Sequence, residues 1–286
     1  MTWHSSTYSK VDIIGRTLES LESIVVFNSK SSESSLSKIF QNYQNLVQEI
    51  MSGLGDPITT LILFLLFIFW GFFCSYVATY FKMRRNFQTG YTRKIFHFLV
   101  FTSAAAINYI WGFSGVCLFG IVISTFIFFA VYQQESSNLY KSLAREKDVP
   151  HQTLYILIPY FSTLFGGLSI NLFFPEYVAL GYLICGIADA SGEVVGTKFG
   201  KHSFTVKTIG KHMPEKSIEG SASVFVLTFI IYILFAYSEL KTFTPEMFFL
   251  LFICSLIITV LEIYTTKGFD NFTIQVLSIW FYAILI

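Results

Sequence analysis

The stretch ITTLILFLLFIFWGFFCSYVATY, residues 58–80, decides the class of fold of this protein. It contains no charged side chain, and a helix of about 20 apolar residues is long enough to cross the hydrocarbon core of a bilayer. The whole chain has the same character, since 53% of its 286 residues are hydrophobic, 13% are charged and the mean hydropathy is +0.60. An ordinary soluble domain carries roughly 25% charged residues. The sequence therefore predicts an integral membrane protein.

Apolar runs recur along the rest of the chain. Backbone groups inside a bilayer must be hydrogen-bonded within their own segment, so each run is expected to be a helix. The predicted spans are 58–80, 95–111, 115–133, 153–173, 176–188, 220–238, 246–263 and 272–286. The run 176–188 is short but could continue into the glycine-rich stretch that follows it, and the last run is also short. The sequence predicts an all-α, polytopic membrane helical bundle with seven or eight transmembrane helices.

Residues 1–57 differ from the rest of the chain. They are serine-rich, mixed in charge and only weakly periodic, which predicts a partly helical extramembrane N-terminal arm before a transmembrane domain at 58–286. The first long apolar run begins near Ile58 with no basic region just before it, so no cleavable signal peptide is expected.

The distribution of charge predicts the orientation and excludes some partners. If eight spans alternate and the first runs inward, 14 of the 19 basic residues lie in interior loops, which favours an exterior arm. Three polar segments then share the cytoplasmic face, namely 89–97, 189–219 and 265–273. The formal net charge of +1 predicts no nucleic-acid partner. Four cysteines stand singly in apolar runs, so neither a zinc site nor a disulfide framework is expected.

The segment GIADASGEVVGTKFGKHSF, residues 186–204, carries chemically capable groups where a span should end. Asp189 and Glu193 are four residues apart and would share one face of a helix. Two carboxylates one turn apart suit Mg²⁺, which commonly also binds substrate phosphates. Glycines at the same interval, Gly192, Gly196 and Gly200, would let a phosphate or another backbone approach. Alternatively, the glycines form a helix-packing face and the carboxylates point to interfacial water.

The segment RKIFH, residues 93–97, allows two interpretations. Arg93 and Lys94 are either topological anchors at the membrane surface or ligands of a phosphate. His97 lies one turn after Arg93, so both side chains could face the same phosphate.

Three motifs together resemble the polyprenol kinase family, which includes dolichol kinase, phytol kinase and the CTP-dependent diacylglycerol kinases. They are RKIFH, then DASGEVVGTKFGKHSF followed by EKSIEGSASVF, and finally EIYTTKGFDNFTI. The resemblance covers roughly residues 90–286. The motif positions of the family fall on Arg93, Lys94, His97, Asp189, Ala190, Gly196, Phe199, Gly200, Lys216, Ser217, Glu219, Gly220, Asp270 and Asn271.

The resemblance implies a catalytic transmembrane domain that transfers the γ-phosphoryl group of CTP, or another nucleotide, to the hydroxyl of a lipid alcohol at the cytoplasmic face. Glu193 has no counterpart in the family pattern. The predicted catalytic residues are Asp189, Asp270, His97 and Lys216. The predicted nucleotide- and phosphate-binding residues are Arg93, Lys94, Gly196, Lys198, Gly200, Lys201, Ser217, Gly220 and Asn271. The predicted Mg²⁺ ligands are Asp189, Glu193 and Glu219.

Other functions stay open at this point. The portion from Asp189 to KSIEG also resembles phosphatidate cytidylyltransferase, although the long C-terminal signature of that enzyme is absent and RKIFH favours a kinase. A transporter would place Asp189 and Glu193 along a cation path, but the internal repeat typical of transporters is missing. A non-catalytic scaffold would use its cytoplasmic loops only to recruit a partner.

Overall fold

The computed structural model describes residues 37–38, 40–45, 48, 57–206, 215–240, 244–266 and 268–285. Residues 37–38, 40–45 and 48 of the predicted N-terminal arm are helical, and Pro57 begins α2; the rest of the arm lies outside the described residues. The segment Gln48–Ile286 forms one compact unit, which carries all the elements discussed below.

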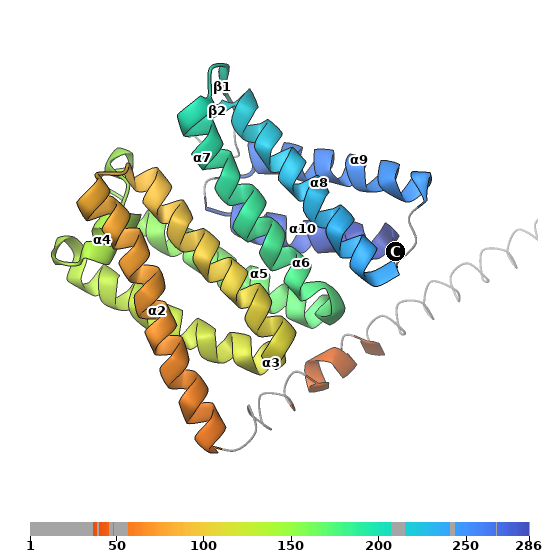
Figure 1. Cartoon of the computed structure of the whole chain (residues 1–286), viewed down its shortest axis with the longest axis horizontal. Coiled ribbons are helices and arrows are strands. Elements are labelled where there is room, and N and C mark those ends of the chain that lie inside the picture. The colour runs from red at the N-terminus through yellow and green to blue at the C-terminus, as the bar shows by residue number, and fades with distance from the viewer. Residues whose placement is uncertain are drawn as a thin grey trace, which may run out of the picture. The chain divides into compact units, whose positions relative to one another are not determined.

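Helices dominate the described part of this unit (Figure 1). The α-helices are α2 (Pro57–Arg85), α3 (Thr89–Gln133), α4 (Asn138–Leu143), α5 (Leu154–Phe173), α6 (Val178–Leu183), α7 (Ala190–Phe199), α8 (Ile218–Leu240), α9 (Pro245–Tyr264) and α10 (Asp270–Leu285). Short 3₁₀ turns lie at η1 (Gln134–Ser136), η2 (Glu146–Asp148) and η3 (Pro175–Tyr177), and a π-helical segment, η4 (Ile184–Asp189), joins α6 to α7. Two short strands, β1 (Ser203–Thr205) and β2 (Glu215–Ser217), pair antiparallel with Ser203 opposite Ser217.

Six helical stretches are long and apolar enough to cross a membrane, which confirms an all-α membrane protein with several spans. They are Pro57–Arg85, Thr89–Ser136, Leu154–Phe173, Pro175–Phe199, Ile218–Glu239 and Pro245–Tyr264. The stretch Pro175–Phe199 shows that the short apolar run at 176–188 does continue through η4 into the glycine-rich α7. By contrast, α10 has 16 residues and is not among the six.

Helix α3 is bent back on itself at Gly112. A straight helix of its 45 residues would be about 68 Å long, twice the thickness of the hydrocarbon core. Gly112 has φ 62° and ψ −155°, a conformation that L side chains disfavour and that breaks the helix. Phe67 of α2 packs edge-on against both Trp111 and Phe119, which lie on either side of the break. Figure 1 shows the chain reversing there, so residues 89–111 and 113–133 are called the first and second halves of α3.

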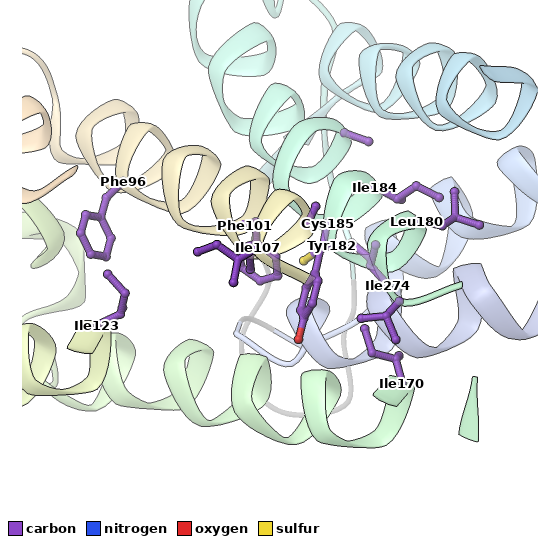
Figure 2. Close-up of a cluster of buried hydrophobic side chains, with 14 of the residues drawn as sticks. Phe96, Phe101, Ile107, Ile123, Ile170, Leu180, Tyr182, Ile184, Cys185 and Ile274 are labelled. Atoms are coloured by element: carbon purple, nitrogen blue, oxygen red, sulfur yellow. The ribbon is translucent and has the colours of Figure 1, made fainter. Parts of the chain in front are cut away.

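The core forms where α6 and η4 pass between α3, α5 and α10 (Figure 2). Leu180, Ile184 and Ile170 are fully buried there, and Ile274 of α10 completes the contact. The opposite faces of the helices remain apolar and exposed, as Leu234 at 63% illustrates. This pattern is expected where lipid, rather than water, covers the outside of the protein.

Candidate functional site

A buried ion pair between α3 and η4 is the centre of the candidate site. Lys94 Nζ lies 2.5 Å from Asp189 Oδ2, and the two side chains are only 6% and 2% exposed. The imidazole Nε2 of His97, one turn after Lys94, lies 3.4 Å from the same carboxylate oxygen. Charges at membrane depth are costly unless they are paired, and they commonly mark functional sites. The structure therefore brings together two of the three polar segments identified in the sequence, residues 89–97 and 189–219.

The hydrogen bond of His97 indicates which ring nitrogen carries the proton. His97 Nε2 is 2.9 Å from the backbone carbonyl oxygen of Cys185, and a carbonyl can only accept. The proton therefore lies on Nε2, and Nδ1 of the neutral ring is an acceptor. The carbonyl belongs to the π-helical segment η4, a type of turn that often occurs at functional sites.

The third polar segment reaches the site through the start of α10. Gly268 precedes this helix with φ 93°, and a Cβ there would lie 3.1 Å from Pro159 Cδ of α5, so only glycine suits the turn. Asn271 Nδ2 donates to the Pro159 carbonyl oxygen at 3.2 Å and to Thr163 Oγ1 at 2.8 Å. These bonds fix α10 on α5 and hold the neighbouring Asp270 in place.

Electrostatic interactions connect Asp270 and Lys216 with Asp189. Asp270, the first residue of α10, interacts electrostatically with Asp189 and with Lys94. Burial disfavours the charge of Lys216, but the carboxylate of Glu262 more than compensates, so the pKa of Lys216 lies above its usual value. Lys216 Nζ donates directly to Glu262 Oε1. All four predicted catalytic residues, including His97, thus lie within electrostatic reach of the Lys94–Asp189 pair.

Glu193 lies one turn after Asp189 in a separate ion-pair network. Its carboxylate is 3.3 Å from Arg93 Nη2 and 3.2 Å from Arg145 Nη1. Arg145 also binds Asp148 Oδ2 through Nε at 3.0 Å. Glu193 therefore joins α7 to α3 and to the chain after α4. Arg93, predicted to bind phosphate, is occupied by this carboxylate.

The glycines of α7 pack against α8. A Cβ at Gly196 would lie 2.9 Å from Ser217 Oγ, and a Cβ at Gly220 would lie 2.6 Å from the carbonyl oxygen of Gly192. Gly200 also faces Ser217, whose Oγ accepts a hydrogen bond from the Gly220 backbone N–H at 3.1 Å at the start of α8. This is the packing role that the sequence left open. Their predicted phosphate contacts stay predictions.

Three other predicted residues have different neighbours. Lys198 Nζ lies 5.2 Å from the centre of the Phe199 ring, Lys201 is exposed, and Glu219 Oε1 is 2.8 Å from His202 Nδ1. No hydrogen bond or ion pair found among residues 57–206 and 215–240 joins these three to Lys94 or Asp189.

Only one group of three potential metal ligands occurs within the described ranges. His97, Cys185 and Asp189 bring one ligand atom each within 4.8 Å of one another. Mg²⁺ prefers oxygen ligands, so this mixed set differs from the predicted trio of Asp189, Glu193 and Glu219. The predicted Mg²⁺ site of Asp189, Glu193 and Glu219 stays a prediction.

Sequence reasoning missed Glu262, Arg145 and Asp148. Glu262 lies near the end of an apolar run, so an acidic residue requiring a partner was a detectable signal. Arg145 and Asp148 sit in a polar connection where charges are expected anyway, and only the folded chain shows that both are buried, at 7% and 6% exposure.

A cavity of about 440 Å³ opens onto the charged cluster. Its charged and ionisable lining at this end comes from Arg93, Lys94, His97 and Asp270, with Asn271 beside them. Most of its wall is apolar and includes Phe101, Phe113, Phe119, Ile123, Ile127 and Leu164. A pocket of this size, with a few polar groups at one place, is typical of a small-molecule site.

Comparisons with protein-family models, curated proteins and solved structures found no match to this chain. The function is therefore argued from the geometry of the site and from the motifs themselves.

Proposed function

We propose that this protein is an integral membrane lipid kinase that transfers the γ-phosphoryl group of CTP, or another nucleoside triphosphate, to the hydroxyl of a lipid alcohol of the polyprenol, phytol or diacylglycerol type. The observation that carries the proposal is the apolar cavity that ends at Lys94, His97 and Asp270. A lipid alcohol has the matching distribution of polarity, with one hydroxyl at the end of a hydrocarbon body. Neither a cation path nor a protein-recruiting loop would need such a cavity.

The chemistry requires positioning and charge stabilisation more than covalent participation by the protein. The substrate hydroxyl oxygen attacks the γ-phosphorus, the bond to the bridging oxygen breaks, and the nucleoside diphosphate leaves. Asp270 or Nδ1 of His97 accepts the hydroxyl proton, since both residues line the cavity. Lys94, Lys216 and Arg93 supply positive charge for phosphate oxygens once their present carboxylate partners are displaced or shared.

Mg²⁺ is proposed as the accompanying ion. Asp189 would hold it, with Asp270 as a second oxygen ligand in the case that Nδ1 of His97 is the base. When bound, the ion would neutralise phosphate charge. Glu193 and Glu219 are placed differently, because their ion pairs are with arginines and with His202, whereas Asp189 pairs with Lys94 and His97.

The proposed topology has eight membrane segments, with the two halves of α3 counted separately and α10 as the last. The N-terminal arm lies outside and the catalytic groups lie on the cytoplasmic face. In support, the three polar segments meet through Lys94, Asp189 and Asp270, as segments at one membrane surface can.

The test is an assay of purified protein in detergent with CTP labelled at the γ-phosphate, Mg²⁺, and a panel of lipid alcohols alongside phosphatidate. Label should appear in a lipid monophosphate. Asp189→Asn should abolish this product, whereas Glu176→Gln, at an exposed position in η3, should retain it.

Three other outcomes would contradict parts of this proposal. Labelled pyrophosphate formed with phosphatidate alone would identify a cytidylyltransferase. Full Mg²⁺-dependent turnover by Asp189→Asn would refute the metal assignment, and no turnover with any lipid would refute the enzyme proposal.

A further inference from the structure

A second hollow lies on the outside of the second half of α3 and α5. Its wall consists of Ile121, Ser124, Thr125, Phe128, Phe129, Tyr132 and Tyr160. Phe129 is 58% exposed and Tyr132 is 86% exposed, so this aromatic groove faces the surroundings of the helices. In a membrane those surroundings are lipid chains.

The groove and the cavity are neighbours. They share Ile121, Ser124 and Tyr160 as lining residues. Tyr160 Oη donates a hydrogen bond to Ser124 Oγ at 2.7 Å, and Ser124 Oγ donates to the carbonyl oxygen of Gly120 at 2.5 Å. A rotation of the two side chains would therefore join the two hollows without moving either helix.

Gly120 lies on the cavity side of this contact. It lines the cavity, and a Cβ built there meets no atom within 4 Å. By contrast, a Cβ at Gly167, which also lines the cavity, would lie 2.8 Å from Tyr182 Oη. Position 120 is therefore open space that a larger side chain would occupy.

The path from the groove to the polar end of the cavity is short. Tyr160 and Thr163 are one turn apart on α5, and Thr163 Oγ1 accepts the hydrogen bond from Asn271 next to Asp270. A hydroxyl that passes Tyr160 thus reaches the charged cluster within about one helical turn, ~5 Å along α5. The remaining hydrocarbon chain can stay in the groove and the bilayer.

We propose that this groove is the lateral entrance of the cavity, through which one hydrocarbon chain bearing a terminal hydroxyl enters from the bilayer, and that the size of residue 120 limits its passage. The proposal rests on the proposed function in taking a lipid alcohol as the occupant. The Tyr160–Ser124 hydrogen bond closes the entrance when no lipid is present.

The test is photolabelling of the full-length protein in lipid nanodiscs, without nucleotide, by a long-chain alcohol that carries a diazirine on its chain. Mass spectrometry then locates the label. We expect it on Phe119 and Ile123, which line the cavity and are only 2% and 6% exposed. Excess unlabelled alcohol should suppress this labelling.

Three variants test whether the alcohol enters past residues 120 and 160. Gly120→Phe should lower the labelling of Phe119 and Ile123 about tenfold, the ratio that corresponds to ~1.4 kcal/mol of binding. Tyr160→Phe removes the hydrogen bond while keeping the ring, and should increase the labelling rate. Leu234→Phe, which adds a ring on the exposed face of α8, should leave it unchanged. Melting temperatures of all variants verify that they are folded.

The outcomes separate this inference from the proposed function. Labelling that follows the expected pattern in a protein without kinase activity supports the entrance and refutes the kinase. A protein that phosphorylates lipid alcohols, but in which Gly120→Phe changes neither labelling nor turnover of long-chain substrates, refutes the entrance. Label confined to exposed residues of α8 and α9 also refutes it.

Discussion

The two sides of the η4–α7 segment meet their neighbours in opposite ways. Toward α3 and the connection after α4, Asp189 and Glu193 meet the positive charges of Lys94, Arg93 and Arg145. Toward α8, the backbone of Gly192 and Gly196 packs closely against Gly220. The contact with α3 is stable only while each buried charge has a partner of opposite sign. The contact with α8 is possible only because glycine has no side chain. The η4–α7 segment thus forms ion pairs on one side and a close helix–helix contact on the other.

The largest expected effect concerns the charged contact. Lys94→Met leaves the Asp189 carboxylate buried without its partner, which should lower the free energy of unfolding by about 3–5 kcal/mol. Reversible unfolding in detergent measures the change. The double variant Lys94→Met/Asp189→Asn removes both charges and should recover most of the loss. Equal losses in the single and double variants would contradict the pairing.

The contact between α7 and α8 should be destabilised by the addition of a single methyl group. Gly220→Ala places a methyl group 2.6 Å from the Gly192 carbonyl oxygen, which is backbone and cannot move aside, so we expect a loss of about 1–3 kcal/mol. The matched control is Gly120→Ala, where the added methyl meets nothing within 4 Å. The control should be neutral or slightly stabilising in the same unfolding experiment. Similar losses in both variants would contradict the packing explanation, because backbone entropy favours alanine over glycine in a helix.

Glu193 tests whether the charged contact is structural or catalytic. Glu193→Gln weakens charged hydrogen bonds to Arg93 and Arg145 and should cost about 1–2 kcal/mol of stability. In the kinase assay, the Mg²⁺ concentration for half-maximal activity should stay unchanged. A marked increase in that concentration would instead make Glu193 a metal ligand, as the sequence predicted.

The smallest effect is expected at the ion pair between Lys82, near the end of α2, and Glu146, whose side chain is largely exposed. Lys82 Nζ lies 2.7 Å from Glu146 Oε1, and this hydrogen bond lowers the pKa of Glu146. A lowered pKa in the folded state means that the stabilisation is present above the unfolded pKa, roughly 4.3, and is lost as the pH falls through the folded value. Because the Glu146 side chain is 73% exposed, the contribution should be below about 1 kcal/mol.

Melting curves of the wild type and Glu146→Gln against pH measure this contribution. The wild type should melt higher at pH 7, and the difference should vanish in acid. A difference that grows in acid would contradict the assignment.

Much of the fold was predictable because membrane insertion depends on local composition. The apolar runs at 58–80, 153–173, 220–238 and 246–263 each coincide with a single helix. The short gap around Gly112 correctly separated two apolar runs, although both belong to one interrupted helix. The count of seven or eight spans and the orientation remain predictions.

The site was predictable only in part. Lys94, His97, Asp189 and Asp270 stood out because each is a polar group beside an apolar run. Which residues pair with one another was not predictable, because the contacts join residues far apart in the sequence. Lys94 and Asp189 are 95 positions apart, and Lys216 and Glu262 are 46 apart. The glycines were ambiguous, because a stripe without side chains can receive either a phosphate or a helix.

By itself the sequence determined that this protein is a helical membrane protein and which of its polar groups lie at the ends of apolar segments, because hydrophobicity and helix length act locally along the chain. Only the tertiary structure decided which charges neutralise one another, which glycines are filled by α8, and where a cavity remains. Those features depend on the positions of several helices at once, and no single segment contains that information.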